Sequence, residues 1–279
     1  MDTIPGVEIS CYIICKNEEK YIEAALRSVA FCQEIIVVDS GSTDATAAIV
    51  QRLIAEGMPI RWFVKEWPGY SAQKQFALEQ CTREWCLSID ADERIDPDAL
   101  PELARRLPSA RENGWRLKFS HYLYGYGYAP ETTASPILRL TRNGKAFYKP
   151  DLLVHEGLSV EGKIGQFRQR AILHRGVLDT KNKIAKELNY AELKARQLHA
   201  RGKRPRYVRL VFNPLIYFLR VYFLRMYALA GWPGFVHAAR LAVYSFTTEA
   251  ILFEMHRHEV PPGDDDPDAI FFTGRGTGP

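Results

Sequence analysis

The chain has 279 residues, of which 47% are hydrophobic and 25% are charged, and these proportions are ordinary for a folded globular protein. They exclude a chain that is disordered over most of its length, and they allow one large domain with a smaller appendage. The net charge of +4 is unevenly spread: residues 1–100 hold nine basic and seventeen acidic side chains, whereas residues 171–225 hold thirteen basic and three acidic ones. Because nothing resembles a nucleic-acid-binding module, we expect the basic part to face an anionic membrane or a phosphorylated molecule and not nucleic acid.

The cysteines and the N-terminus indicate a reduced intracellular protein. The chain has five cysteines and no C-x-x-C pair, so we expect buried free thiols at Cys11, Cys15, Cys32, Cys81 and Cys86. The first ten residues are neither basic nor followed by an apolar run, so no signal peptide is expected.

Apolar runs alternate with segments of helical periodicity in the first hundred residues. Strands are expected at Val7–Cys15, Ile35–Val38, Ile60–Val64 and Trp85–Ile89. Helices are expected between them at Glu18–Phe31, Asp44–Glu56 and Ser71–Gln80. Ser42 or Thr43 is placed to cap the second helix. This alternation predicts a mostly parallel sheet with right-handed crossovers, whose ligands bind beyond the carboxyl ends of the strands.

The middle of the chain has strand character after a helix that is expected at Asp98–Leu107. Further strands are expected at Trp115–Tyr124, Ile137–Arg142 and Ile172–His174. The aromatic stretch His121–Tyr128 contains two glycines. It is either hydrophobic packing around a flexible loop or a wall on which a sugar or a nucleobase stacks, and the sequence leaves both readings open.

The C-terminal part is predicted to be helical, basic and partly apolar. Residues 178–202 have a basic helical pattern, and residues 206–232 are apolar apart from Arg209, Pro214, Arg220 and Arg225. These interruptions make a membrane-spanning helix costly. Either a buried packing element or an amphipathic helix pair in a membrane interface remains, and five basic residues without an acid in 201–209 favour the interface. The Pro-, Gly- and Asp-rich tail after Val260 is predicted to be disordered.

Carboxylates follow the predicted strands at the edge where ligands bind. Asp90 and Asp92 come directly after an apolar run, and such oxygen ligands suit Mg²⁺ or Mn²⁺ bridging the phosphates of a nucleotide. A D-x-D pair alone also occurs by chance in surface turns. Asp39 is either a turn former or an acceptor for a nucleobase and ribose, and Glu18 either caps a helix start or faces a nucleoside. Glu93 is either an orienting partner or a residue that starts a helix.

Four motifs give the chain a family resemblance. The segments ISCYIICKNEEKYI, EIIVVDSGSTDAT, SAQKQFAL and WCLSIDADE cover most of residues 9–95, and together they resemble family 2 glycosyltransferases of the GT-A fold. More narrowly, they are similar to the bacterial branch that adds a sugar to the lipopolysaccharide inner core, including β-1,4-glucosyltransferases. The resemblance extends less sharply to VHEGLSVEG (154–162), ILHR (172–175) and KNKIAKELNYAEL, and it thins after about residue 205.

The resemblance implies a role for each polar residue of these motifs. Asp39 would contact the base, Glu18 would lie near the nucleoside, and Lys74 would approach the ribose or the phosphates. Asp90 and Asp92 would hold the sugar and the metal–diphosphate, with His174 as a further metal ligand. The family inverts the anomeric centre, so one base must deprotonate the acceptor hydroxyl; we choose Glu156, with His155 as its neighbour or as a second candidate. Mg²⁺ or Mn²⁺ is the implied cofactor.

The implied fold is a GT-A-like, Rossmann-like α/β arrangement: a mixed, mostly parallel sheet flanked by helices, followed by a helical, basic C-terminal extension. We expect a nucleotide-sugar-binding half at 1–100, an acceptor-binding half of the same domain at 101–178, the helical extension at 179–259 and a disordered tail at 260–279.

The implied activity is inverting transfer of a hexose, glucose from UDP-glucose, to a lipid-linked anionic saccharide of the lipopolysaccharide core. We expect the protein to be cytoplasmic and peripheral at the inner face of the cytoplasmic membrane. The alternatives are transfer to polyprenyl phosphate or another cell-surface glycan, and a non-catalytic nucleotide-binding adaptor. A dinucleotide oxidoreductase is excluded because no G-x-G-x-x-G follows the first strand.

Overall fold

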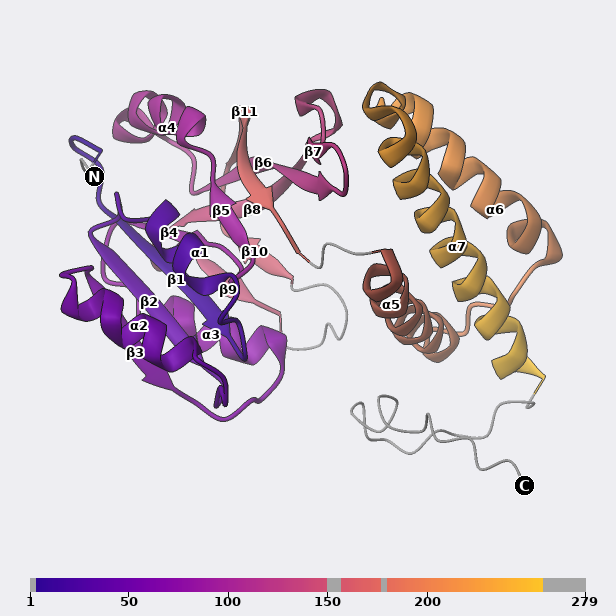
Figure 1. Cartoon of the computed structure of the whole chain (residues 1–279), viewed down its shortest axis with the longest axis horizontal. Coiled ribbons are helices and arrows are strands. Elements are labelled where there is room, and N and C mark those ends of the chain that lie inside the picture. Colours follow the sequence, from indigo (N-terminus) through magenta and orange to yellow (C-terminus); the bar gives the residue numbers. More distant parts are fainter. Residues whose placement is uncertain (1–3, 150–156, 177–179, 258–279) are drawn as a thin grey trace.

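The apolar runs of the sequence form the strands of a nine-stranded sheet, and three long helices follow it (Figure 1). The computed structural model describes residues 4–149, 157–176 and 180–257, and each structural statement below concerns these residues. The first strands and helices are β1 (Ile9–Cys15), α1 (Ile22–Ser28), β2 (Glu34–Asp39), α2 (Thr46–Ala55), β3 (Ile60–Val64), α3 (Tyr70–Glu79) and β4 (Trp85–Ser88).

The second half of the sheet and its connections follow β4. They are β5 (Glu93–Ile95), η1 (Pro97–Ala99), α4 (Leu100–Arg106), η2 (Leu107–Ser109), β6 (Gly114–Leu123), β7 (Gly127–Tyr128), η3 (Glu131–Thr133), β8 (Ser135–Arg142), β9 (Ala146–Tyr148), β10 (Leu158–Val160) and β11 (Ile164–His174). The C-terminal elements are α5 (Thr180–Ala200), α6 (Tyr207–Leu219), the π-helical turn η4 (Arg220–Leu224), η5 (Tyr227–Ala230) and α7 (Gly231–His256).

The strand order places the ends of β1, β2 and β4 side by side. The order is β3-β2-β1-β4-β8-β6-β11-β5, with β7 paired to β6, and β9 and β10 form a separate two-stranded sheet. β3, β2, β1 and β4 are all parallel, as are β6 and β11, whereas β8 is antiparallel to both of its neighbours and β5 is antiparallel to β11. The predicted GT-A-like mixed sheet is therefore confirmed, with its parallel strands concentrated in the first half.

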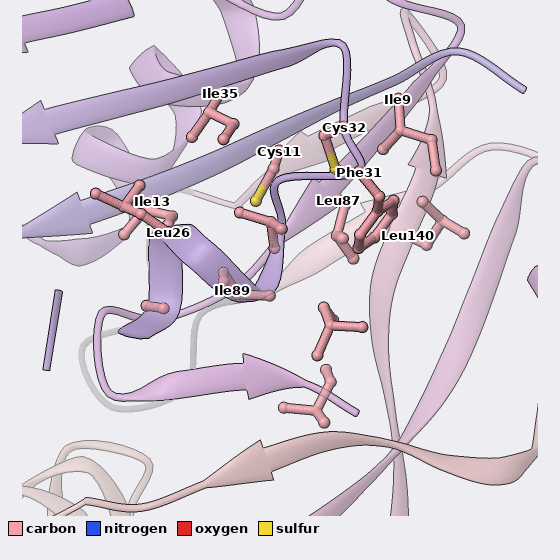
Figure 2. Packing of buried hydrophobic residues seen from close by; sticks show 14 of the residues in the cluster. Ile9, Cys11, Ile13, Leu26, Phe31, Cys32, Ile35, Leu87, Ile89 and Leu140 are labelled. Atoms are coloured by element: carbon pink, nitrogen blue, oxygen red, sulfur yellow. The ribbon is translucent and has the colours of Figure 1, made fainter. Parts of the chain in front are cut away.

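Helices cover both faces of the parallel half, which explains why its strands are mostly apolar. Residues of α1, α2 and α4 pack on one face with side chains such as Ile9, Ile13 and Leu87. On the other face, residues of α3 pack against Tyr12 and Ile36. Figure 2 shows the first of these two layers, with Cys11 and Cys32 among its aliphatic side chains. A strand that is buried on both faces favours a continuous apolar run, such as Ile35–Val38 in the middle of β2.

The turns after β1 and β2 are joined by hydrogen bonds, and the predicted N-terminal cap of α2 is wrong. The N-cap residue of α2 is Ala45, which makes no side-chain capping bond. The Asp44 carboxylate accepts the N–H of Thr46 at 2.9 Å, and the Glu19 carboxylate accepts that of Ala45 at 3.1 Å. Ser42 is not the cap because its hydroxyl is used in the preceding turn, where it accepts the N–H of Asn17 at 2.9 Å.

The C-terminal helices join the sheet through a small apolar cluster. Leu123 and Ala129 after β6 pack against Val221, Tyr227 and Ala238. α7 lies along both α5 and α6, and the α6–α7 pair is antiparallel (Figure 1). No residue of α6 is buried, so this helix is not a buried packing element, whereas Val221 and Tyr227 after it are buried in the cluster.

Part of the C-terminal region has the length and hydropathy of a membrane-spanning helix. In the described chain this segment is Tyr207–Leu224, and 6% of it is buried. One such helix is weak evidence of spanning, and Arg209, Pro214 and Arg220 all lie inside it.

All five cysteines are free and buried, as the sequence predicts. The four-part domain division stays a prediction, and the tail at 260–279 lies outside the described residues.

Candidate active site

The carboxylate of Asp90 lies between two cations just beyond the end of β4. Its Oδ1 is 2.7 Å from Nζ of Lys74 on α3, and its Oδ2 accepts a hydrogen bond from Nη2 of Arg139 on β8 at 2.9 Å. Burial alone would raise the pKa of Asp90, but Arg139 and Lys74 outweigh burial and hold this pKa well below its usual value. Asp90 is therefore ionised, and both of its oxygens are engaged by the protein.

Glu93 completes this ionic group from the start of β5. Its side chain is 1% exposed; one carboxylate oxygen accepts Nη2–H of Arg139 at 2.6 Å and the other accepts the N–H of Asp90 at 2.9 Å. Burial raises the pKa of Glu93, and the attraction of Arg139 opposes this. Glu93 thus orients the Asp90 turn, which is one of its two predicted roles, and it starts a strand and not a helix.

Asp92 is paired with His174; the resemblance implies that both residues are metal ligands, and that role stays a prediction. Oδ2 of Asp92 lies 3.1 Å from Nε2 of His174, which ends β11 beside Glu93 of β5. Burial lowers the pKa of His174, but the hydrogen bond and charge of Asp92, with Glu93 and Asp90, outweigh burial and raise it. The imidazole therefore lies among three carboxylates that favour its protonated form.

Three histidines extend from this pair toward the C-terminal helices. The ring centroid of His174 is 5.4 Å from that of His121 on β6, which in turn is 5.6 Å from that of His237 on α7. Burial, followed by the charges of its neighbours, lowers the pKa of His121 well below the usual value for histidine. His237 has no predicted role, and His121 was predicted only as part of the aromatic stretch His121–Tyr128.

Asp39 and Glu18 lie in the turns that follow β2 and β1. Asp39 is buried, and its carboxylate accepts the N–H of Ser42 at 3.1 Å and the hydroxyl of Ser42 at 2.5 Å. Its predicted role as a turn former is therefore present in the structure. The side chain of Asn17 bridges the two turns, because its Oδ1 accepts the N–H of Thr43 at 2.7 Å.

Glu18 belongs to the same acidic group as Asp90 and Asp92. Its backbone N–H donates to the Thr46 hydroxyl at 2.8 Å. Burial, followed by the charge of Asp92, raises the pKa of Glu18 to about 7, and Lys186 of α5 opposes this shift. Glu18 therefore lies within electrostatic reach of the D-x-D motif and of the first of the C-terminal helices.

The structure thus brings together most of the predicted site residues. Lys74 pairs with Asp90, Asp92 pairs with His174, and Glu18 is close to both pairs. The Lys74 side chain is only 2% exposed and its amine lies on Asp90, so its predicted approach to the nucleotide stays a prediction. The catalytic candidates His155 and Glu156 lie outside the described residues.

Arg139 was missed by the sequence analysis, although it contacts both Asp90 and Glu93. The available signal was a basic side chain inside the apolar strand segment Ile137–Arg142. Such a residue is costly in a sheet interior unless acids neutralise it.

The side chains near Asp92 supply part of the coordination that a divalent cation needs. Among the described residues no group of three or more His, Cys, Asp or Glu side chains could hold a metal ion. Asp92 and His174 offer one carboxylate and one imidazole side by side, whereas both oxygens of Asp90 are already paired. Mg²⁺ and Mn²⁺ accept such a sparse protein set when phosphate oxygens and water complete the coordination.

Residues 10–150 match the family model of Glycosyl transferase family 2. The chain is 47% identical over 266 residues to "Lipopolysaccharide core biosynthesis glycosyltransferase LpsC" of Rhizobium meliloti (strain 1021), a match that covers 94% of this chain and 98% of that protein. It is also 44% identical over 97 residues to an uncharacterized glycosyltransferase of Rickettsia bellii (strain RML369-C), which covers 34% of this chain and 31% of that one.

Two solved structures have a similar arrangement at low sequence identity. TarS 1–349 of S. aureus in complex with UDP has a TM-score of 0.49 at 17% identity, covering 91% of this chain and 93% of that one. The mannosyltransferase PcManGT of Pyrobaculum calidifontis, in complex with GDP-Man and Mn²⁺, has a TM-score of 0.49 at 14% identity, covering 98% and 81% respectively.

Proposed function

The chain belongs to glycosyl transferase family 2 and is a glycosyltransferase, and from that premise we propose that it transfers a hexose to a saccharide of the lipopolysaccharide core. The observation that carries this proposal is the similarity to LpsC at 47% identity along 94% of the chain. We further propose that the donor is UDP-glucose and that the acceptor is a lipid-linked anionic saccharide, as the motifs of the sequence imply.

Each polar residue of the site then has a proposed task in binding the donor. Asp39 and Glu18 recognise the nucleoside from the turns after β2 and β1. Asp90 is fixed by Lys74 and Arg139, so it presents a rigid ionised carboxylate to the sugar. Asp92 and His174 would hold Mg²⁺ or Mn²⁺, which supplies positive charge to the leaving diphosphate.

The transfer itself needs one proton acceptor and one displacement. The acceptor hydroxyl attacks the anomeric carbon from the side opposite the diphosphate, and its proton passes to the carboxylate of Glu156, with His155 as the second candidate. The new C–O bond forms as the bond between the anomeric carbon and the diphosphate oxygen breaks, and the nucleoside diphosphate leaves with that electron pair. The anomeric configuration is thereby inverted.

Calorimetric titration of UDP into the full chain, with and without Mn²⁺, tests the donor site. We expect binding that depends on the metal and is lost in Asp92→Ala, because this change removes one of the two paired ligands. Asp98→Ala is the matched control, since Asp98 is an exposed carboxylate beyond β5 whose removal should leave UDP binding unchanged.

The nucleotide and the reaction are then tested separately. If UDP does not bind while GDP, ADP or CMP does, the proposed donor is wrong but the transferase stands. If none of the four binds to the wild-type chain, the donor site itself is refuted. Once a nucleotide that binds is known, the reaction is tested by measuring transfer of labelled glucose to lipopolysaccharide core acceptors. Loss of this transfer in Glu156→Gln tests the proposed base.

We also propose that the protein is cytoplasmic and contacts the inner face of an anionic membrane through α6 and α7. Large apolar side chains on these helices are exposed, and Val208, Val211 and Leu215 of α6 are 66%, 65% and 54% exposed. Their spacing of three and four residues places them on one side of the helix. Arg206, Arg209, Arg220 and Arg225 lie along the same segment, a composition typical of helices in an anionic membrane interface. The absence of sedimentation with anionic liposomes at low salt would refute this proposal.

A further inference from the structure

A pocket of about 170 Å³ lies where the C-terminal helices meet the end of β6. Tyr124 after β6, Lys183 of α5, and Trp232, His237 and Arg240 of α7 are among the residues that line it. Pockets that enclose drug-sized ligands have about 300–1,000 Å³, so this one is suited to a small part of a larger molecule, such as one sugar ring. It lies outside the Asp90–Asp92 group.

The charge of the pocket favours an anion. Lys183 and Arg240 line it, and they act with Arg225 on His237, which is therefore surrounded by cations. The acid paired with Arg240 is Glu187, at 2.6 Å, and it offsets one of these charges. Burial and the three cations lower the pKa of His237 to about 3, so the imidazole is neutral. Its Nδ1 already lies 3.0 Å from Nη2 of Arg240, which leaves Nε2 as its other hydrogen-bonding atom.

Two exposed aromatic rings offer a surface for a sugar. The side chains of Trp232 and Tyr124 are 72% and 69% exposed. Trp232 is held in place by stacking on Phe235, with ring centroids 5.1 Å apart and an interplanar angle of 13°. Aromatic faces stack on the apolar faces of sugar rings, and a nearby cation then selects a ring with a charged substituent.

The pocket is connected to the proposed donor site by the three histidines. His237 lines the pocket and its ring contacts that of His121, which contacts that of His174 beside Asp92. A molecule held in the pocket is thus two ring contacts away from the proposed metal ligands. The two steps are 5.6 Å and 5.4 Å between ring centroids, so an acceptor of more than one sugar could occupy the pocket and the proposed donor site together.

We propose that the pocket between β6, α5 and α7 binds a negatively charged sugar of the acceptor, one that carries a phosphate or a carboxylate. Lys183 and Arg240 pair with the anionic group, and Trp232 and Tyr124 pack against the ring. The proposal rests on the proposed function because it names the acceptor class of that site. It also gives the stretch His121–Tyr128 a mixed role, since Leu123 packs in the apolar cluster and both Leu123 and Tyr124 line the pocket.

The test is a titration of the full chain with glucose 6-phosphate and with glucuronate, followed by ligand-observed NMR. It is run with and without saturating UDP and Mg²⁺, and glucose and inorganic phosphate serve as reference ligands. We expect at least one charged sugar to bind roughly tenfold more tightly than either reference ligand, because both the ring and the charge are recognised. UDP should not displace it.

Two variants and a matched control locate the binding. Lys183→Met removes the cation and keeps the stem, and Trp232→Ala removes an exposed ring whose loss should not disturb the fold. Each should weaken binding of the charged sugar about tenfold while UDP binding is unchanged. Lys181→Met is the control, since Lys181 is exposed on the same helix and does not line the pocket; it should bind like the wild type.

Four results would refute the pocket proposal and leave the donor site unaffected. The first two are that neither charged sugar binds, or that the charged sugar binds the wild type and both variants with equal affinity. The other two are that inorganic phosphate binds as tightly as the sugars, or that UDP displaces the sugar. If UDP binds normally in these experiments, only the acceptor pocket fails. If UDP does not bind but the charged sugar does and responds to the variants, the pocket stands and the donor assignment fails.

Discussion

At the scale of single residues, the carboxylates of the site differ in how many cationic partners hold them. Asp90 and Glu93 share Arg139, and Asp90 is also paired with Lys74. Asp92 has only His174 as a side-chain partner among these groups. The D-x-D motif therefore combines one carboxylate that two cations hold with one that a single histidine holds.

We predict that Arg139→Met destabilises the fold by about 3 kcal/mol, because it leaves the buried Glu93 without its cation. The double variant Arg139→Met with Glu93→Gln should recover part of this loss, since it removes the unpaired charge as well. The measurement is the urea midpoint of unfolding. Arg27→Met removes a cation from the exposed ion pairs of α1 and should leave the midpoint close to the wild-type value. Equal effects of the buried and the exposed change would contradict this account.

Stability should depend on pH through His237, whose pKa is about 3 in the folded chain against about 6.5 unfolded. As pH falls below 6.5 the unfolded chain takes up this proton first, so the free energy of unfolding decreases until about pH 3. One such group contributes a slope of at most about 1.4 kcal/mol per pH unit. His174 has the opposite shift, so the comparison must be between His237→Gln and the wild type. Urea unfolding at pH 7.5 and pH 5 should show a smaller loss for the variant, and equal losses would refute the prediction.

At the scale of elements, α7 is anchored by a close approach of backbones at its first turn. A Cβ atom added at Gly234 would lie 1.9 Å from the carbonyl oxygen of Tyr227, which belongs to η5. A backbone oxygen cannot rotate away as a side chain can, so Gly234→Ala must move the helix.

We predict that Gly234→Ala costs about 1–3 kcal/mol of stability and separates α7 from the apolar cluster around Leu123. Val243→Ala is the control in the same helix, because Val243 is half exposed and should tolerate the change. Thermal unfolding measures the loss of stability, and hydrogen exchange of the α7 amides locates it. Normal amide protection along α7 in Gly234→Ala would show that the contact does not anchor the helix.

Elements and residues differ in how well the sequence predicted them. The strands β1, β2 and β4 follow from mostly apolar runs, because burial on both faces permits little else, and β3 follows from its β-branched and aromatic side chains. Asp92 and His174 were each predicted as metal ligands through family resemblance; the structure places them side by side, and the metal role stays a prediction. Arg139, His121 and His237 could not be found in the same way, since their role depends on which strands and helices lie next to each other. The cap of α2 failed for a similar reason: Ser42 and Asp39 form a local bond that sequence spacing does not distinguish from a helix cap.

At the scale of the whole molecule, the acidic and basic parts of the sequence correspond to different surfaces. The acids of the first hundred residues include Glu18, Asp90 and Asp92 of the site, whereas the basic segment forms α5 and α6. The two meet where Lys186 of α5 acts on Glu18 and where Lys183 lines the pocket. Beyond that contact the exposed face of α6 combines positive charge with apolar side chains, so its proposed membrane binding has two separable contributions.

These contributions respond differently to salt, and this yields the last prediction. Binding to vesicles that contain anionic lipid should weaken steeply between low and physiological ionic strength, because the attraction of the arginines is screened within about 10 Å at 0.1 M salt. The double variant Val211→Glu with Leu215→Glu replaces two exposed apolar side chains of α6 with acids, so it should abolish sedimentation at every salt concentration while leaving thermal stability and UDP binding intact. Arg209→Gln should weaken binding only at low salt, which separates charge from apolar insertion. Sedimentation of the double variant at wild-type levels would mean that α6 does not contact the bilayer. Vesicle binding by the wild type that is insensitive to salt would mean that the basic segment does not contribute.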